Sequence, residues 1–314
     1  MKDTFEREVD YLRISVTDRC NLRCLYCMPD GVVKKSHDEI MRDEEIIVVV
    51  KEAVKIGITK IRVTGGEPLV RKGIYNLIKK IHDVKGVKEI TITTNATLLI
   101  GHVKELKESG ISRVNFSLDT LDKDKFKYIS NTELTLDYEK LIKELIYFNL
   151  TPIKINTVLL RGVNDNEISD FIELADKYDI VIRFIELMPI GHINFDHKTY
   201  FISKDEILKD HQELSFVRKD NVSEYYEVKG KKGLIGFINP ISHKFCEDCN
   251  RIRLTADGHL KPCLHNNNEI YIKNTLESEI IDKLREAIES KPKSHKLDES
   301  SSNQSVRPMN KIGG

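Results

Sequence analysis

The sequence lacks three features, and each absence excludes a broad class of protein. Lysine and arginine total 50, as do aspartate and glutamate, so the formal net charge is zero, which argues against unspecific nucleic-acid binding. The apolar runs, such as residues 46–50, are far too short to span a membrane. No G-x4-G-K-[ST] pattern occurs, which excludes a P-loop nucleotide site.

Residues 1–10 carry charges of both signs and no apolar stretch, so we expect no secretory signal. We therefore expect a cytoplasmic protein with no nucleic acid and no membrane among its partners. In a reducing compartment, clustered cysteines indicate metal ligands before disulfides. The length of 314 residues, 40% of them hydrophobic, suits one large domain and a smaller one.

Short apolar runs alternate with amphipathic stretches between residues 11 and 188. This alternation is typical of a parallel sheet with right-handed crossovers. Six such units predict an α/β fold, a partial (β/α)6 TIM-like barrel, with a doubly wound open sheet as the alternative. The predicted strands are 12–17, 60–64, 89–93, 113–118, 152–158 and 181–186, and the predicted helices are 43–57, 73–83, 102–109, 137–149 and 166–178.

The composition changes after about residue 195. Short strands are expected near 214–218, 224–229, 233–238 and 251–256, and a helix near 275–290. We expect a barrel over residues 1–195, a smaller C-terminal domain with antiparallel strands over 196–290, and a flexible linker with a Gly-Gly tail over 291–314.

The polar and glycine-rich segments of the first part follow the predicted strands. In barrels of this kind, active residues gather at the C-terminal ends of the strands. We therefore expect one rim of the barrel to carry the site. The segments are 17–27, 65–68, 94–95, 117–119, 156–157 and 186–189.

The six cysteines form two trios, and none is left over. A cubane iron–sulfur cluster held by three cysteines keeps one iron open for another ligand, which suits a trio without a fourth partner. Structural zinc needs four ligands. At the second trio, a Cys3His zinc site that uses His265 therefore stays open on spacing alone. The trios are Cys20, Cys24 and Cys27, spaced C-x3-C-x2-C, and Cys246, Cys249 and Cys263, spaced C-x2-C-x13-C.

The motifs around these cysteines carry a resemblance to known enzymes. The first trio, with Tyr26 before its last cysteine and the turn Gly65-Gly66-Glu67-Pro68 after the second strand, resembles the radical S-adenosylmethionine (SAM) superfamily. The second trio within FCEDCNRIRLTADGHLKPCL, together with the chain end Ile312-Gly313-Gly314, is similar to the GTP 3′,8-cyclase family of molybdenum cofactor biosynthesis.

This resemblance implies two [4Fe-4S] clusters, one on each trio, with SAM chelated by the open iron of the first and guanine contacting the open iron of the second. It implies that a 5′-deoxyadenosyl radical abstracts hydrogen from the 3′ carbon of GTP, which gives 3′,8-cyclo-7,8-dihydro-GTP. The residues implied for SAM are Tyr26, Gly66, Ser117 and Met188. Those implied for GTP are Arg13, Arg62, Thr93, Lys154, Arg251 and Arg253, and the implied catalytic set is Arg13, Arg251, Arg253, Gly313 and Gly314.

The implied partners are an electron donor and the pyranopterin monophosphate synthase that converts the product. The oligomeric state stays open, a homodimer included. One alternative is a peptide-modifying radical SAM enzyme with an auxiliary cluster domain, although such enzymes tend to carry more cysteines at the second site. The other is a zinc-binding or nucleic-acid-binding protein without enzymatic activity, which zinc without iron or sulfide would favour.

Overall fold

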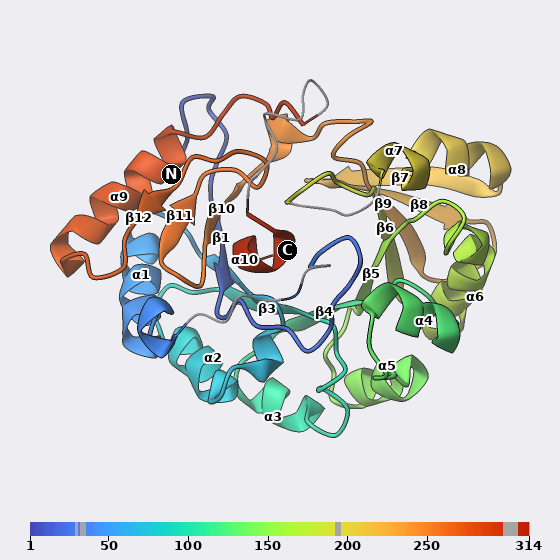
Figure 1. Ribbon diagram of the computed structural model, residues 1–314, viewed down its shortest axis with the longest axis horizontal. Coiled ribbons are helices and arrows are strands. Elements are labelled where there is room, and N and C mark those ends of the chain that lie inside the picture. Colours follow the sequence, from blue (N-terminus) through green and yellow to red (C-terminus); the bar gives the residue numbers. More distant parts are fainter. Residues whose placement is uncertain (29–30, 32–35, 192–195, 298–306, 314) are drawn as a thin grey trace.

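The computed structural model describes residues 1–28, 31, 36–191, 196–297 and 307–313. Its centre is a curved parallel sheet, with the first six strands side by side in sequence order (Figure 1). This confirms the α/β prediction and the positions of the six strands. The strands are β1 (Tyr11–Ser15), β2 (Lys60–Thr64), β3 (Glu89–Thr94), β4 (Arg113–Ser117), β5 (Lys154–Val158) and β6 (Val181–Ile185).

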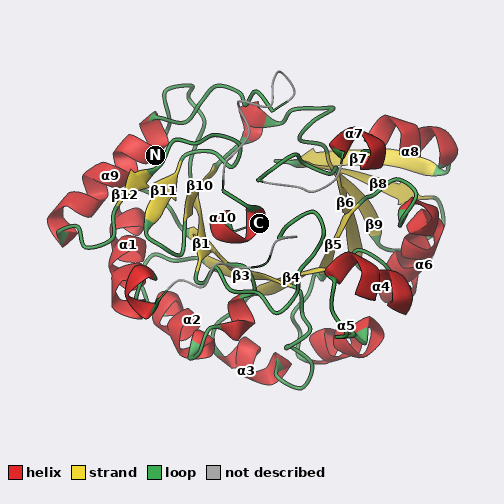
Figure 2. Ribbon diagram, in the orientation of Figure 1, coloured by secondary structure: helices red, strands yellow, loops and turns green. Residues whose placement is uncertain are grey.

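The helices that connect these strands cover the outer face of the curved sheet, as Figure 2 shows. The helix α4 was not predicted from the sequence, whereas the other long helices lie close to their predicted bounds. Asp122 caps α4 by accepting hydrogen bonds from the backbone N–H groups of Asp124 and Lys125. The helices are α1 (Asp43–Lys55), α2 (Ile74–His82), α3 (Val103–Glu108), α4 (Lys123–Ser130), α5 (Tyr138–Tyr147) and α6 (Ile168–Tyr178).

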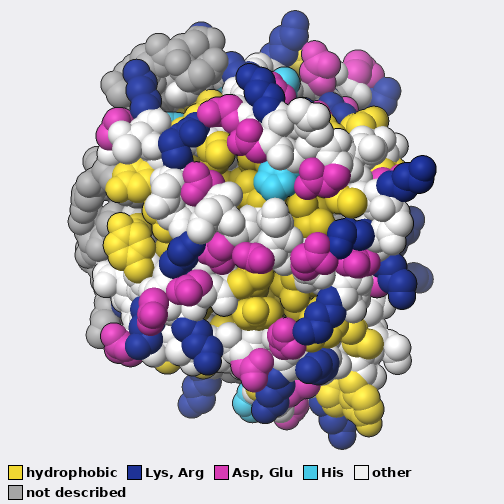
Figure 3. Space-filling model, turned by 90° about the vertical axis from the view of Figure 1, so that its right-hand side faces the viewer, with side chains coloured by type: hydrophobic (Ala, Val, Ile, Leu, Met, Phe, Trp, Pro, Cys, Tyr) yellow, Lys and Arg dark blue, Asp and Glu magenta, His cyan; other side chains and the backbone are white. Residues whose placement is uncertain are grey.

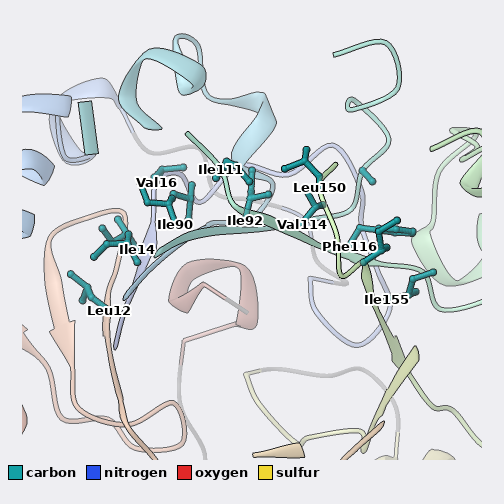
Figure 4. Packing of buried hydrophobic residues seen from close by; sticks show 14 of the residues in the cluster. Leu12, Ile14, Val16, Ile90, Ile92, Ile111, Val114, Phe116, Leu150 and Ile155 are labelled. Carbon is teal, nitrogen blue, oxygen red and sulfur yellow. The ribbon is translucent and has the colours of Figure 1, made fainter. Parts of the chain in front are cut away.

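The hydrophobic core lies between the sheet and these helices. Alternate residues of each strand, such as Leu12 and Ile14 of β1 and Ile90 and Ile92 of β3, point outward to the helices (Figure 4). The intervening residues point to the inner face of the curve. Because the apolar side chains of the strands pack against the helices on the outer face, the inner face can carry polar side chains.

The C-terminal part of the chain extends the same sheet at both ends. Strand β9 (Leu234–Ile238) pairs parallel to β6, and β10 (Arg251–Leu254) pairs parallel to β1. The six-stranded parallel layer predicted from the sequence is therefore longer by one strand on each side. Antiparallel strands continue outward from both, which confirms that part of the prediction: β8 (Ser223–Val228) and β7 (Leu214–Asp220) beyond β9, and β11 (His259–Lys261) and β12 (Ile270–Tyr271) beyond β10.

The hydrogen-bonded order runs from β12 to β7, and among the described residues no strand pairing joins these two edges. The division of the chain at residues 195 and 196 stays a prediction. The remaining helices are α7 (His197–Tyr200), α8 (Lys204–Asp210), α9 (Glu277–Glu289) and α10 (Met309–Ile312). Of these, α10 and the described chain end lie inside the curve of the sheet (Figure 1).

The described part of the expected flexible linker, residues 291–297, is packed into the protein, since Lys291, His295 and Leu297 are buried. Residues 298–306 of that linker lie outside the described residues. The face drawn in Figure 3 mixes cationic and anionic side chains with apolar areas between them, as expected from the zero net charge. A search of the described residues found no helix long and apolar enough to cross a membrane.

Candidate active site

The inner face of the curved sheet surrounds a cavity of about 530 Å³. The cavity collects both cysteine trios and every residue that the sequence suggested for SAM and GTP, although their roles stay predictions. These lining residues are Arg13, Cys20, Cys24, Tyr26, Cys27, Arg62, Gly66, Thr93, Ser117, Lys154, Met188, Cys246, Cys249, Arg251, Arg253 and Cys263. Gly313 lies beside the cavity, and Gly314 lies outside the described residues.

The first cysteine trio lies in the loop that leaves β1. Burial, together with the nearby Cys20, raises the pKa of the Cys27 thiol to about 12. Burial likewise raises the pKa of Cys24, with contributions from Cys27 and Cys20. The three cysteines thus lie in one loop whose surroundings disfavour free thiolates. This donor set fits a cationic iron cluster, because the metal would stabilise the thiolates that these surroundings disfavour.

The turn Gly65-Gly66-Glu67 fixes this cysteine loop through the backbone. The N–H of Gly66 donates to Thr17 O at 2.7 Å, and that of Glu67 donates to Arg19 O at 2.8 Å. A Cβ on Gly66 would lie 2.5 Å from Arg19 O. The family resemblance implied that Gly66 contacts SAM. The contact in the structure is a close approach of the chain to its own cysteine loop.

Glu67 is fully buried behind this turn. Its carboxylate accepts hydrogen bonds from Thr94 Oγ1 at 2.7 Å and from the N–H groups of Asn95 and Leu69 at 2.6 and 3.0 Å. Burial raises the pKa of Glu67 to about 7, although these hydrogen bonds oppose the shift. The Glu67 side chain therefore links the C-terminal ends of β2 and β3, and its backbone N–H holds the cysteine loop at Arg19.

The raised pKa of Glu67 predicts a pH dependence of stability. The folded protein binds this proton more tightly than the unfolded chain, so the unfolding free energy of the cluster-free protein should fall as pH rises from about 4.5 to about 7. The full change is on the order of 3 kcal/mol. Urea denaturation across this range should give a smaller pH slope for Glu67→Gln than for the unaltered protein, and equal slopes would contradict the assignment.

Asp119 is a site residue that the sequence reading did not single out. It follows β4, and its Oδ2 accepts a hydrogen bond from Tyr26 OH at 2.7 Å while its Oδ1 accepts one from the N–H of Val158 at 2.9 Å. Burial raises the pKa of Asp119 to about 6. Asp119 therefore fixes the Tyr26 ring beside the first trio. The sequence could have identified Asp119 as a site residue, because it comes just after a predicted strand.

The second trio lies on the opposite side of the cavity, around β10. The ammonium of buried Lys291 donates to Cys249 Sγ at 3.5 Å, to Arg251 O at 2.7 Å and to Pro262 O at 3.2 Å. Burial raises the pKa of the Cys249 thiol, but the cations of Lys291 and Arg251 outweigh that effect and lower it. The sequence analysis placed Lys291 in a linker, and in the structure it donates to a cysteine sulfur of this trio.

His265, considered from spacing as a fourth zinc ligand, is buried next to the second trio. Its backbone N–H donates to Cys263 Sγ at 3.4 Å, and its ring Nε2 contacts Met188 Sδ at 3.4 Å. Within the described residues, no group of three or more His, Cys, Asp and Glu side chains is gathered closely enough to hold one metal ion.

Between the trios, cationic side chains line the inner face of the sheet. Arg253, Arg13 and Arg62 lie in register on the adjacent strands β10, β1 and β2. Side chains in register on neighbouring strands share a face. Lys154 and Arg183 continue the cationic face on β5 and β6, and Lys154 Nζ donates to Tyr225 OH at 3.2 Å.

Tyr11 and Arg183 were missed by the sequence reading. The guanidinium groups of Arg62 and Arg251 each lie 5.4 Å from the centre of the Tyr11 ring, and they come from the strands on either side of β1. Such cation–π contacts hold guanidinium groups in place. Arg183 sits in an apolar strand like Arg13, and the charge within a strand could have identified it.

Arg183 and Arg253 are buried, and Arg62 and Lys154 are partly buried, with little negative charge beside them. Burial, reinforced by neighbouring arginines, lowers the pKa of Arg183 and of Arg253 to about 10 each. Among the described residues, no carboxylate forms an ion pair with Arg62, Lys154 or either of these arginines. Buried charges are normally paired. The arrangement therefore fits an anionic ligand with several charged oxygens.

The chain end closes one side of the cavity. Gly313 O accepts a hydrogen bond from Arg253 Nη1 at 2.5 Å, and Asn310 Nδ2 donates to Asp18 O at 2.9 Å beside the cysteine loop. Gly313 has a φ of 70°, and a Cβ there would lie 2.7 Å from Thr64 Cγ2. Only glycine meets both requirements without strain.

Two family models match this chain. Residues 14–175 match the radical SAM superfamily, and residues 180–297 match the family described as Molybdenum Cofactor Synthesis C. The chain is similar to the GTP 3′,8-cyclase of Clostridium botulinum at 48% identity over the full length of both chains. It is also similar to those of Alkaliphilus oremlandii, at 47%, and Thermodesulfovibrio yellowstonii, at 44%, again over full length.

Among solved structures, Streptococcus suis SuiB bound to S-adenosylmethionine has the same fold, with a TM-score of 0.61 at 18% identity. The match covers 88% of this chain and 68% of that one. The two matched models and the full-length similarity agree with the cavity that the two trios and the cationic strands enclose. The chain belongs to the GTP 3′,8-cyclase family of the radical SAM superfamily.

Proposed function

We propose that this protein cyclises GTP to 3′,8-cyclo-7,8-dihydro-GTP in the first step of molybdenum cofactor biosynthesis. It does so as a SAM-dependent radical enzyme, a lyase, with a [4Fe-4S] cluster. When bound, cluster and SAM together supply a radical that removes a hydrogen atom from the substrate. The single observation that carries the proposal is one cavity that joins a cysteine trio to a row of buried cations.

Cys20, Cys24 and Cys27 would hold the cluster. Tyr26, Gly66, Ser117 and Met188 line the same cavity and would contact SAM. The chain's own part is to fix the cysteine loop through Gly66 and Glu67 and to orient Tyr26 through Asp119. These contacts are preorganised, because they link loops that follow three different strands, β1, β2 and β4.

The cationic face would bind the triphosphate of GTP. Arginine suits this role because its planar fork forms bidentate bonds with phosphate oxygens. We assign Arg13, Arg62, Lys154, Arg251 and Arg253 to GTP, with Thr93 beside them, and we add Arg183. A triphosphate would also relieve the repulsion among these cations.

The second trio, Cys246, Cys249 and Cys263, would hold a second [4Fe-4S] cluster next to the guanine end of GTP. Lys291 supports this assignment, because its buried ammonium has no carboxylate partner among the described residues and donates to Cys249 Sγ. Donors to cluster sulfurs are a recurring way of stabilising such sites. A zinc site at this trio is the competing assignment.

Arg13, Arg251 and Arg253 would act on the substrate together with the tail residues Gly313 and Gly314. An electron donor and the pyranopterin monophosphate synthase are the expected partners. Residues 1–195 and 196–290 would act as one catalytic unit, because β9 and β10 of the second segment extend the sheet of the first.

Deuterium transfer tests this function. The protein is reconstituted without oxygen and supplied with dithionite, SAM and GTP deuterated at the 3′ carbon. We expect deuterium in the 5′-deoxyadenosine, as measured by mass spectrometry. Unlabelled 5′-deoxyadenosine would retain the radical chemistry and reject abstraction at that carbon. Zinc without iron or sulfide in the purified protein would reject the proposal altogether.

A further inference from the structure

The tail, residues 307–313, contacts the protein at both of its ends. At the cavity, Asn310 and Gly313 make the contacts with Asp18 and Arg253 described above. At the other end, Arg307 lies between two carboxylates. Its Nη1 donates to both oxygens of Asp257, at 3.0 and 2.8 Å, and its Nη2 lies 2.7 Å from Glu269 Oε2.

Both carboxylates are held in place by other contacts. Thr255 Oγ1 donates to Asp257 Oδ1 at 2.6 Å, within the turn that joins β10 to β11. The ammonium of Lys261, whose side chain is fully buried, lies 3.0 Å from Glu269 Oε1. The cations of Lys261 and Arg307 thus lie beside the carboxylates of Asp257 and Glu269, which other contacts already hold in place. Bidentate pairs of this kind are the strong ones among ion pairs.

The tail needs such an attachment. The helix α10 has only four residues, far too few to be stable by itself, and chain ends fray unless they are tied down. At the cavity end, the tail is held by two hydrogen bonds that accept on backbone oxygens. Asn310 donates to Asp18 O, and Arg253 donates to Gly313 O. Among the described residues, Arg307 is the one that connects the tail to fixed carboxylates, and these lie outside the residues assigned to SAM, GTP and the clusters.

We propose that Arg307 is a positioning residue that anchors the catalytic tail, holding α10 and Gly313 in the cavity through Asp257 and Glu269. It is not among the residues that line the cavity, and it acts through the tail. The inference rests on the proposed function in one respect, the part that the tail plays in turnover. The position of the tail and the rate of turnover can be measured separately, so the two can fail separately.

The experiment replaces Arg307 in the full-length, cluster-loaded protein. In Arg307→Gln, we expect deuterium exchange in the peptide over residues 307–314 to be roughly tenfold faster, and kcat for GTP to fall by about tenfold or more, with a smaller change in KM. Arg307→Lys keeps one ion pair and should restore part of both. Adding Asp257→Asn to Arg307→Gln should change little further, because Arg307→Gln already removes the ion pair between these two residues.

Arg285→Gln is the matched control, because it removes an arginine paired with Asp282 on the exposed side of α9. It should leave exchange and turnover unchanged, and iron content should be equal in all variants. Unchanged exchange in Arg307→Gln would overturn the anchor, whatever the activity does. Faster exchange with full activity would uphold the anchor and reject the role of the tail in turnover.

Discussion

Replacing Gly66 with alanine is expected to reduce GTP cyclisation by at least about 100-fold, because a displacement of about 1 Å at a catalytic constellation can have that effect. The added Cβ would lie 2.5 Å from Arg19 O and 2.7 Å from Arg19 C, both backbone atoms. The neighbouring hydrogen bonds from Gly66 and Glu67 to Thr17 and Arg19 leave the loop no free direction in which to move. The cysteine loop would have to shift, and with it Cys20.

The measurement is iron content together with the rate of product formation. We expect iron to fall with activity, because the displaced loop holds the first cluster poorly. Gly162→Ala is the control, since no atom lies within 4 Å of its Cβ position although its φ is 72°. It should cost about 1 kcal/mol in stability and leave turnover intact. A Gly66→Ala protein with full iron content and full activity would show that the close contact relaxes without consequence.

Replacing Cys263 with alanine is expected to abolish cyclisation while SAM cleavage continues. The first trio lies in a different loop, so its cluster should remain, and iron should fall from about eight to about four atoms per chain. Without the second cluster, GTP would lose its contact at the guanine end, and 5′-deoxyadenosine would form without cyclised product. The loss of product should exceed about 1,000-fold, because the reacting carbon is no longer held near the radical.

Iron and sulfide analysis, 5′-deoxyadenosine yield and product yield together decide the outcome. Cys24→Ala is the matched control, and it should remove SAM cleavage and cyclisation alike. If Cys263→Ala retained about eight irons, or cyclised GTP at the normal rate, the second cluster would be wrongly placed. If the unaltered protein held about four irons and one zinc, the zinc assignment at the second trio would replace the cluster.

The sequence located the elements of the fold well where the signal was local. The six strands β1 to β6 begin or end within about two residues of their predicted bounds, because apolar runs between amphipathic stretches report burial directly. It did not predict that β10 pairs with β1, since Tyr11 and Arg251 are far apart in the chain. No local pattern encodes a pairing over that distance, and β10 read as part of a separate antiparallel unit.

The candidate site divides in the same way. By itself, the sequence determined the two cysteine trios and the Gly-Gly-Glu-Pro turn, because each is defined by residue type and spacing. The family resemblance supplied several of the cations. Only the tertiary structure decided that Arg183 joins those cations, that Lys291 serves the second trio and that Arg307 holds the tail. Each of these three acts through a partner distant in sequence. The physical reason is that the role of a buried charged side chain depends on the groups packed around it, and those groups come together only once the chain has folded.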